Sequence, residues 1–265
     1  MQTTTYSSLK VNPNRSEKRM DTLVIEAPLQ ININNEPYTV VMRTPSNDNA
    51  LIQGLLFAED IYRANPPLEM ALISETKAFS SIINCTIPAH LLGKGYLNKR
   101  TLLSVSSCGI CGKQSLEDIE ITGTALENTT QISQQKIEQM QAQMQVAQLA
   151  FKESGGSHAA AIFNTQQQLL TCKEDIGRHN AVDKCIGELL SNKQLNHAHS
   201  LFVSGRVSYE IVSKAFFAKI PILVAISACS SLAVDYANEF GLCLIGFSRN
   251  NSMTVYTHPQ RLKTS

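Results

Sequence analysis

The 265-residue sequence lacks several features that would place it in a broad class of proteins. No apolar run approaches the length of a membrane-spanning helix. Residues 1–21 are polar and contain no apolar segment of the kind found in a secretory signal. The 23 Lys and Arg nearly balance the 22 Asp and Glu, so neither a general nucleic-acid binder nor a membrane-surface binder is expected. An anionic partner must therefore be met by local basic residues.

The common nucleotide and zinc motifs are also missing from the sequence. Without a GxGxxG or GxxxxGK[ST] pattern, neither a Rossmann dinucleotide site nor a P-loop is expected. No second CxxC and no HxxxH completes a zinc site with the one CxxC pair. A cytidine-type zinc deaminase needs a glutamate two residues after its histidine, but Ala160 stands there after His158. We therefore expect no intrinsic metal. Four other residues could in principle be recruited by zinc: His158, Cys172, His179 and Cys185.

The sequence does contain one CxxC pair, Cys108-Gly109-Ile110-Cys111, followed by Gly112 and Lys113. Two thiols at this spacing can bind half of a metal site, cycle between dithiol and disulfide, or carry sulfur as a persulfide. The glycines leave the sulfurs accessible, and a helix start with a nearby cation favours the reactive thiolate. These residues alone leave all three functions open, with redox or sulfur chemistry favoured over zinc. The other five cysteines are scattered, which fits a reducing cytoplasm.

The apolar periodicity predicts a β-rich first part and a second part in which strands and helices alternate. Residues 1–21 are interpreted as a flexible lead-in, and residues 22–130 as a β-rich subdomain with the CxxC loop. Residues 131–265 have apolar, β-branched strands, which indicates a partly parallel sheet covered by helices. The expected strands are 22–25, 29–33, 38–42, 80–87, 159–163, 169–172, 200–203, 222–226, 242–247 and 253–256. The expected helices are 51–61, 133–152, 180–190, 208–219 and 231–240.

Three loops that follow predicted strands each carry an arginine beside a glycine or asparagine. They contain Arg178, Arg206 and Arg249. Loops of this kind collect at the ligand-binding edge of an open α/β sheet, and arginines near helix starts suit phosphate. Together they predict a large polyanionic ligand with hydrogen-bonding rings, such as a nucleotide. For the segment 174–184, the alternative is a salt-bridged helix start that binds no ligand.

Five segments, in this order along the chain, closely resemble the formate dehydrogenase accessory sulfurtransferase family, the sulfur carriers for the molybdenum cofactor. The resemblance extends from about Pro28 to Leu262. Each segment alone is a modest signal, but five in order are highly specific. The segments are SCGICG at 107–112, SHAAA at 157–161, EDIGRHNAVDK at 174–184, SGRVSYE at 204–210 and TVYTHP at 254–259.

The resemblance implies a fold and an activity. The fold would be α/β, with a β-rich N-terminal subdomain and a three-layer, cytidine-deaminase-like C-terminal domain around a mixed sheet. The activity would be that of a sulfurtransferase in which Cys108 accepts persulfide sulfur from a cysteine desulfurase. The sulfur would pass to molybdenum bis(molybdopterin guanine dinucleotide) before this cofactor enters formate dehydrogenase. Cys111 matches the second cysteine of the pair, and could attack the persulfide or accept it.

The resemblance also implies where the cofactor binds and which partners are met. The pyrophosphates are expected to meet Arg178, Arg206 and Arg249 in one groove, with His179 beside them. A homodimer in the cytoplasm is expected, with no nucleic-acid or membrane partner. The alternatives are a CxxC dithiol–disulfide oxidoreductase and a structural zinc-binding relative of the deaminases. The expected cofactor-binding loop consists of Phe247, Ser248, Arg249, Asn250, Asn251 and Ser252.

Overall fold

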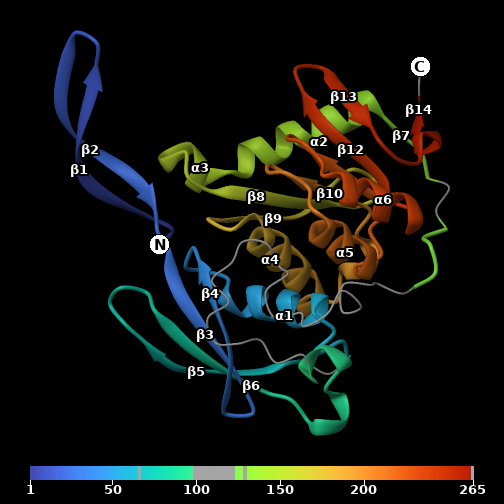
Figure 1. Ribbon diagram of the computed structural model, residues 1–265, viewed down its shortest axis with the longest axis horizontal. Helices are drawn as coiled ribbons and strands as arrows, with labels where there is room; N and C mark the ends of the chain where they lie inside the picture. The colour runs from blue at the N-terminus through green and yellow to red at the C-terminus, as the bar shows by residue number, and fades with distance from the viewer. Residues whose placement is uncertain (65–66, 98–122, 128–129, 264–265) are drawn as a thin grey trace.

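A six-stranded mixed sheet forms the centre of the C-terminal part of the chain (Figure 1). The computed structural model describes residues 1–64, 67–97, 123–127 and 130–263. Within the sheet, β10, β11 and β12 run parallel, whereas β8, β9 and β13 pair antiparallel with their neighbours. In order across the sheet, the strands are β13 (Ser252–Val255), β12 (Cys243–Arg249), β11 (Ile222–Ala225), β10 (Ser200–Val203), β8 (His158–Phe163) and β9 (Leu169–Asp175).

Helices cover both faces of this sheet. On one face, Leu201 and Leu223 share a core with α4, α5 and α6. On the other face, Phe163 and Phe202 share a core with α2. Because both faces are covered, β10 and β11 are buried along their whole length, which explains their continuous apolar sequences. The predicted three layers around a mixed sheet are confirmed. The helices are α2 (Gln134–Ala147), α3 (Leu149–Ser154), α4 (Arg178–Ser191), α5 (Tyr209–Phe217) and α6 (Ser231–Glu239).

The N-terminal part contains a four-stranded sheet that packs on one helix, α1 (Asp48–Ala58). Residues of β3 alternate between buried and partly buried positions, so Leu29 and Ile31 face the core that they share with Leu55 of α1. The described residues of this part are β-rich with one α-helix, as the sequence predicts. In order, its strands are β4 (Glu36–Arg43), β3 (Ala27–Ile33), β6 (Ser81–Thr86) and β5 (Glu69–Glu75).

The two parts are joined where α1 crosses α4 at a pair of glycines. A Cβ atom on Gly54 would lie 2.0 Å from the carbonyl oxygen of Asp183, and one on Gly187 would lie 1.8 Å from that of Ala50. No side chain fits at such distances, so the two helix backbones are in direct contact. α1 therefore lies between α4 and the four-stranded sheet (Figure 1). This contact fixes the N-terminal part against the helix that begins at Arg178.

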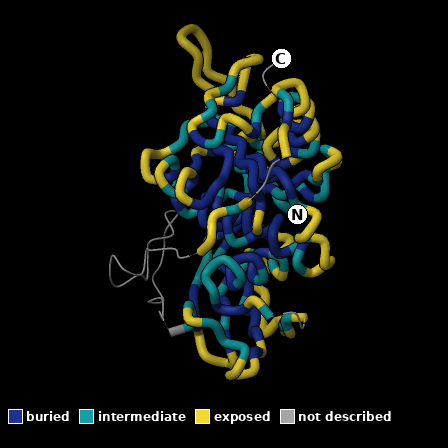
Figure 2. Tube along the Cα trace, turned by 90° about the vertical axis from the view of Figure 1, so that its right-hand side faces the viewer, coloured by how far each residue is buried: buried dark blue, intermediate teal, exposed yellow. Residues whose placement is uncertain are grey.

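Residues 3–24 form an antiparallel hairpin of β1 (Thr3–Asn12) and β2 (Arg15–Val24), where the sequence was interpreted as a flexible lead-in. Most of its residues are exposed (Figure 2), so the strands lack the buried apolar alternation from which strands are predicted. Contacts at the base attach it to α3. The Thr3 hydroxyl donates to Glu153 at 2.8 Å, and the Val24 side chain packs beside Gly156.

The remaining elements are short or differ slightly from prediction. The helix predicted over 133–152 is divided at Gln148 into α2 and α3, and the edge strand β5 was not predicted because nearly all its side chains are exposed. Two short strands, β7 (Ile132–Ser133) and β14 (Leu262–Lys263), pair in parallel. In the parts of the chain that the structure describes, no helix has the length and apolar character needed to cross a membrane. The 3₁₀ turns are Ala89–Leu91, Lys94–Leu97, Leu195–His197 and Pro259–Arg261.

Candidate functional site

The loops that follow the parallel strands lie side by side at one edge of the six-stranded sheet. A backbone hydrogen bond joins the loop after β10 to the loop after β11, through Val207 and Ala228 at 3.0 Å. A second one joins the loop after β11 to the last part of β12, through Ser227 and Phe247 at 3.0 Å. β8 begins and β9 ends at the same edge, where His158 pairs with Asp175. Three of the five segments found in the sequence, 157–161, 174–184 and 204–210, therefore meet where ligands bind in open α/β sheets.

Arg178 and Arg206 are brought together around His158. A Cβ atom on Gly205 would lie 3.3 Å from His158 Nδ1 and 3.4 Å from Arg178 Cδ, so the two side chains approach each other closely over this glycine. Burial lowers the pKa of His158, and the charges of Arg178 and Arg206 lower it further, against an opposing effect of Asp175. The imidazole is therefore neutral at pH 7, and the two guanidinium groups beside it supply positive charge, which favours an anion.

A buried ion pair holds the turn that carries Arg178. Lys184 Nζ lies 2.7 Å from Asp175 Oδ2, and both side chains are fully buried. Asp175 also accepts hydrogen bonds from the Gly177 amide at 2.8 Å and from Asn180 Nδ2 at 2.9 Å. The salt-bridged helix start considered as an alternative is thus present, and its physical role is to position Arg178 and the residue after it.

His179 lies beside two residues at the start of α5, the N-cap residue Ser208 and Glu210 in the first turn. Its Nδ1 lies 3.1 Å from Glu210 Oε2, and its Nε2 lies 3.1 Å from Ser208 Oγ. The sequence interpretation included His179 but missed Ser208 and Glu210. Their signal was the serine and glutamate spaced two residues apart at the predicted helix start. The Glu210 carboxylate also lies 3.7 Å from Lys214 Nζ, which connects this group to the buried interior.

The segment Phe247–Ser252, predicted as a polar loop, is a tight β-hairpin. β12 continues to Arg249, which pairs with Ser252 at the start of β13. The two residues between them, Asn250 and Asn251, have φ values of 53° and 56°. Two consecutive positive φ values are typical of the type I′ turn, and asparagine tolerates them better than most residues. The hairpin therefore has a defined shape on which polar side chains can be presented.

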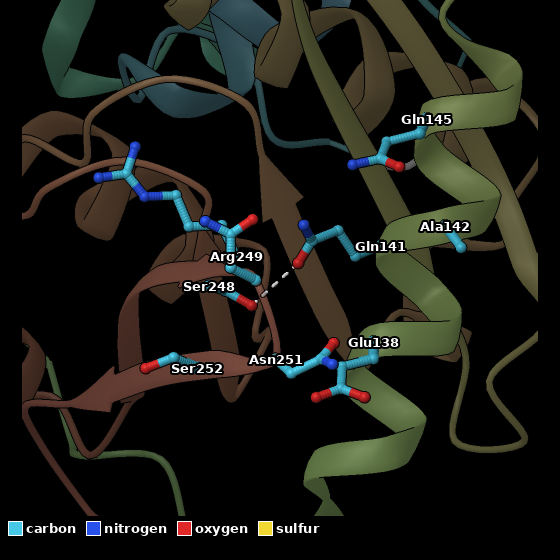
Figure 3. Close-up of a pocket in the computed structure, with 9 residues that line it drawn as sticks. Glu138, Gln141, Ala142, Gln145, Ser248, Arg249, Asn251 and Ser252 are labelled. Carbon is cyan, nitrogen blue, oxygen red and sulfur yellow. Dashed lines mark hydrogen bonds between the residues drawn. The ribbon is translucent and has the colours of Figure 1, made fainter.

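This hairpin and α2 line a pocket (Figure 3). Ser248 Oγ donates to Gln141 Oε1 at 3.0 Å, and Gln134 Nε2 donates to the Asn251 carbonyl at 3.0 Å. The pocket volume is about 120 Å³, so the pocket suits one base or phosphate rather than a whole dinucleotide. Glu138, Gln141 and Gln145 were not predicted. Their signal was the helical spacing that puts them on one face of α2.

Arg249 belongs to this pocket and not to the cluster around His158. Its side chain extends from the hairpin away from α2 (Figure 3), with its guanidinium carbon 5.8 Å from the centre of the Phe247 ring. Neither Arg178 nor Arg206 lines the pocket. Of the three arginines expected in one groove, the structure thus joins two around His158 and places the third in the hairpin pocket.

Cys108 and Cys111 lie outside the described residues. Burial raises the pKa of Cys85 to about 12 and that of Cys229 to about 11, so these thiols are protonated at neutral pH and are poor nucleophiles. The same holds for the other described cysteines, Cys172, Cys185 and Cys243. Among the described residues, no group of three or more His, Cys, Asp or Glu side chains could hold a metal ion.

Comparison with known proteins identifies the family. The model of the FdhD/NarQ family matches residues 24–263. The chain belongs to this family. The resemblance inferred from the five ordered segments is therefore confirmed.

The chain is similar over nearly its whole length to FdhD/NarQ relatives named sulfur carrier protein FdhD. It is 37% identical to the one from Streptomyces coelicolor over 264 residues, which cover 96% of this chain and 93% of the relative. It is 40% identical to the one from Mycolicibacterium paratuberculosis over 253 residues, which cover 92% of this chain and 93% of the relative. It is 37% identical to the archaeal protein of Sulfolobus acidocaldarius over 254 residues, which cover 96% of each chain.

A solved structure shares the fold. It is the crystal structure of a protein assigned as a formate dehydrogenase accessory protein from Desulfotalea psychrophila. The TM-score is 0.78 at 20% identity, and the match covers 99% of this chain and 100% of that one.

Proposed function

We propose that this protein is a sulfur carrier for formate dehydrogenase and acts as a sulfurtransferase through a cysteine persulfide. The observation that carries the proposal is that Arg178 and Arg206 come together around His158 at one edge of the sheet, in a chain similar throughout to named sulfur carriers. The cluster around His158 and the hairpin pocket offer positive charge and hydrogen-bonding groups for an anionic recipient of the sulfur.

The sulfur would be accepted by Cys108 from a cysteine desulfurase. The Cys108 thiolate attacks the outer sulfur of the desulfurase persulfide, the donor's S–S bond breaks, and the desulfurase thiolate leaves. Because the transferred atom keeps its oxidation level, this step needs no oxidant. Cys111 could then attack the inner sulfur of the Cys108 persulfide, which forms a Cys108–Cys111 disulfide and releases HS⁻ to the recipient.

The recipient would be molybdenum bis(molybdopterin guanine dinucleotide), which is a substrate here and not a resident cofactor. Its pyrophosphates suit Arg178 and Arg206, because guanidinium groups bind phosphate oxygens through paired hydrogen bonds. A guanine suits the hairpin pocket, where Gln141 and Gln145 present amides beside Arg249. In this proposal, the protein works as a homodimer in the cytoplasm and meets a cysteine desulfurase and formate dehydrogenase.

The test is to incubate the full chain with a cysteine desulfurase and free cysteine and to measure the intact mass. The wild type should gain one sulfur, about 32 Da, and Cys108→Ala should not. Cys111→Ala should still gain it, because Cys111 acts after loading. A mass increase that persists in Cys108→Ala would contradict the proposal. Loss of two protons in a sample that was never exposed to the desulfurase would favour the dithiol–disulfide alternative, and one zinc per chain in elemental analysis would favour the zinc alternative.

A further inference from the structure

A second pocket lies at the edge of the six-stranded sheet opposite the loop that carries Arg206. His199 immediately precedes β10 and Pro221 immediately precedes β11, whereas Arg206 follows β10, so the two sites are at opposite ends of the parallel strands. We call this cavity the opposite-edge pocket. Its volume is about 350 Å³, against about 120 Å³ for the hairpin pocket, and this size is typical of small-molecule sites. The lining residues are 164–166, 196–199, 219 and 221.

The wall of this pocket is polar and carries no negative charge. Lys219 supplies an ammonium group, and His197 and His199 supply imidazoles. Amide groups come from Gln166 and Asn196. No aspartate or glutamate is among the described residues that line the pocket. An anion bound here therefore meets hydrogen-bond donors and a cation without repulsion from a lining carboxylate.

The buried guanidinium group of Arg261 lies directly behind the wall of the pocket. Its Nη1 donates to the carbonyl of the lining residue Pro221 at 3.0 Å, and its Nη2 donates to the Leu126 carbonyl at 2.9 Å. Arg261 is only 4% exposed, and no carboxylate of the described residues forms an ion pair with it. Buried charges in proteins are normally paired. This cation therefore gives the pocket a positive potential that a bound anion would compensate.

His199 is a buried residue of the pocket wall whose hydrogen bonding is incomplete. The residue is 5% exposed, and its Nδ1 lies 3.1 Å from Ser200 Oγ. Its buried Nε2 has no hydrogen-bond partner among the described residues, which is rare for a buried polar atom. Burial and the charge of Arg261 lower the pKa of His199, so the imidazole is neutral at pH 7 and Lys219 and Arg261 set the charge. A ligand with both donor and acceptor oxygens satisfies Nε2 whether or not this atom carries the proton.

We propose that the opposite-edge pocket binds a small phosphate monoester that carries hydroxyl groups. Two cations without a lining carboxylate match a phosphate monoester, whose charge is about −1.5 to −2 at pH 7. Lys219 binds the phosphate oxygens as a point charge, and Arg261 stabilises the same charge through the wall. The hydroxyl-bearing part of the ligand lies beside the amides of Gln166 and Asn196. This site is separate from the proposed sulfur-transfer site and does not depend on it.

The test follows binding at single histidines by NMR. Ribose 5-phosphate is titrated into the full chain, and the imidazole resonances of His199 and His158 are assigned from the His199→Gln and His158→Gln variants. The His199 resonance of the wild type should shift saturably. Inorganic phosphate should bind about tenfold more weakly, because it makes no hydrogen bond to the amides, and ribose should cause no shift. A His199 resonance that ribose 5-phosphate leaves unchanged would overturn the proposal. Equal affinity for inorganic phosphate would overturn the ester, and a response to ribose would overturn the anion.

Lys193 offers a matched control for Lys219. Both lysines are exposed and follow the end of a helix with left-handed backbone, at φ values of 55° and 58°. Each backbone amide donates back into its helix at 3.0 Å, to Leu190 and to Phe216. Lys219→Gln should weaken the binding that His199 reports by about tenfold, and Lys193→Gln should leave it unchanged. Equal weakening in the two variants would show an effect of net charge alone and overturn the assignment to this pocket.

Arg206→Gln separates the two edges of the sheet. The response of His199 should persist in this variant, whereas any response of His158 to phosphate should be weakened, and Lys219→Gln should have the reverse effect. Loss of the His199 response in Arg206→Gln would show that phosphate acts from the other edge and would overturn the second site. The Lys219→Gln protein should still accept sulfur on Cys108, so a failure of this inference and a failure of the proposed function would be seen separately.

Discussion

Lys184 Nζ and Asp175 Oδ2 lie 2.7 Å apart with no exposure of either side chain. Lys184 also donates to the Thr44 carbonyl at 2.8 Å, so one ammonium group joins α4, the end of β9 and the segment after β4. A buried pair of this kind adds little over an apolar pair of the same shape, but the loss of one partner leaves an uncompensated charge. The pair therefore matters mainly because it fixes the start of α4 against the end of β9 and the segment after β4.

Lys184→Met should lower the free energy of unfolding by about 3–5 kcal/mol, because Asp175 then remains charged in the core. Urea denaturation measures this loss. The control is Arg19→Gln, which breaks the ion pair between Arg19 and Asp21. These two side chains are 41% and 39% exposed, so the control should change the free energy of unfolding by less than about 1 kcal/mol. Equal losses in the two variants would contradict this account of Lys184.

Gly54→Ala should be strongly destabilising, since its Cβ would lie 2.0 Å from the Asp183 carbonyl oxygen. The helices would have to separate, at a cost of about 3 kcal/mol or more. Thermal melting is the measurement, and Asn49→Ala, at an exposed position of the same helix, is the matched control. Alanine at Gly54 without a shift in Tm would show that α1 and α4 do not touch as described.

The neutral state of His158 predicts a pH dependence of stability. Its pKa in the folded protein is below the ordinary 6.5, so between these two values the unfolded chain binds more protons than the folded protein. Stability therefore falls as the pH is lowered through this window, and the loss is complete below the folded pKa. The difference in unfolding free energy between the wild type and His158→Gln should shrink from about pH 7 to about pH 5. A difference that stays constant over that range would refute the assignment.

Arg206→Gln and Arg249→Gln should each weaken binding of GDP, used as a probe for the guanine dinucleotide, by roughly 10- to 100-fold. Each removes a charge-assisted hydrogen bond to phosphate or base. Isothermal titration calorimetry at fixed ionic strength is the measurement. Arg15→Gln, on the exposed hairpin, removes the same charge and should leave the affinity unchanged. If all three variants lost affinity equally, only net charge would be involved.

The parts of the fold that the sequence predicts best are those buried on both sides. Ser200–Val203 and Ile222–Ala225 were located to within one residue, because their continuous apolar sequences have no other stable environment. Apart from the strand predicted at residues 22–25, the hairpin at residues 3–24 was missed. Its stability comes from backbone pairing and a few contacts at its base, and neither produces an apolar periodicity in the sequence.

The candidate site was predicted in its loops but not in its contacts. Loops that follow parallel strands share one edge of the sheet, and this rule correctly predicted that Arg178 and Arg206 lie close together. The pairing of His179 with Ser208 and Glu210 could not be predicted, because it depends on how the starts of α4 and α5 pack. The role of Gln141 and Gln145 could not be predicted either, because these side chains of α2 reach the hairpin pocket only through the packing of α2 on one face of the sheet.

The exposed hairpin of β1 and β2 has one further consequence. An isolated two-stranded ribbon is barely stable in water, and the contacts that support this one, Thr3 with Glu153 and Val24 beside Gly156, are all at its base. Amide hydrogen exchange should therefore be graded along the ribbon: slow near Thr3 and Val24, and progressively faster towards the turn between Asn12 and Arg15.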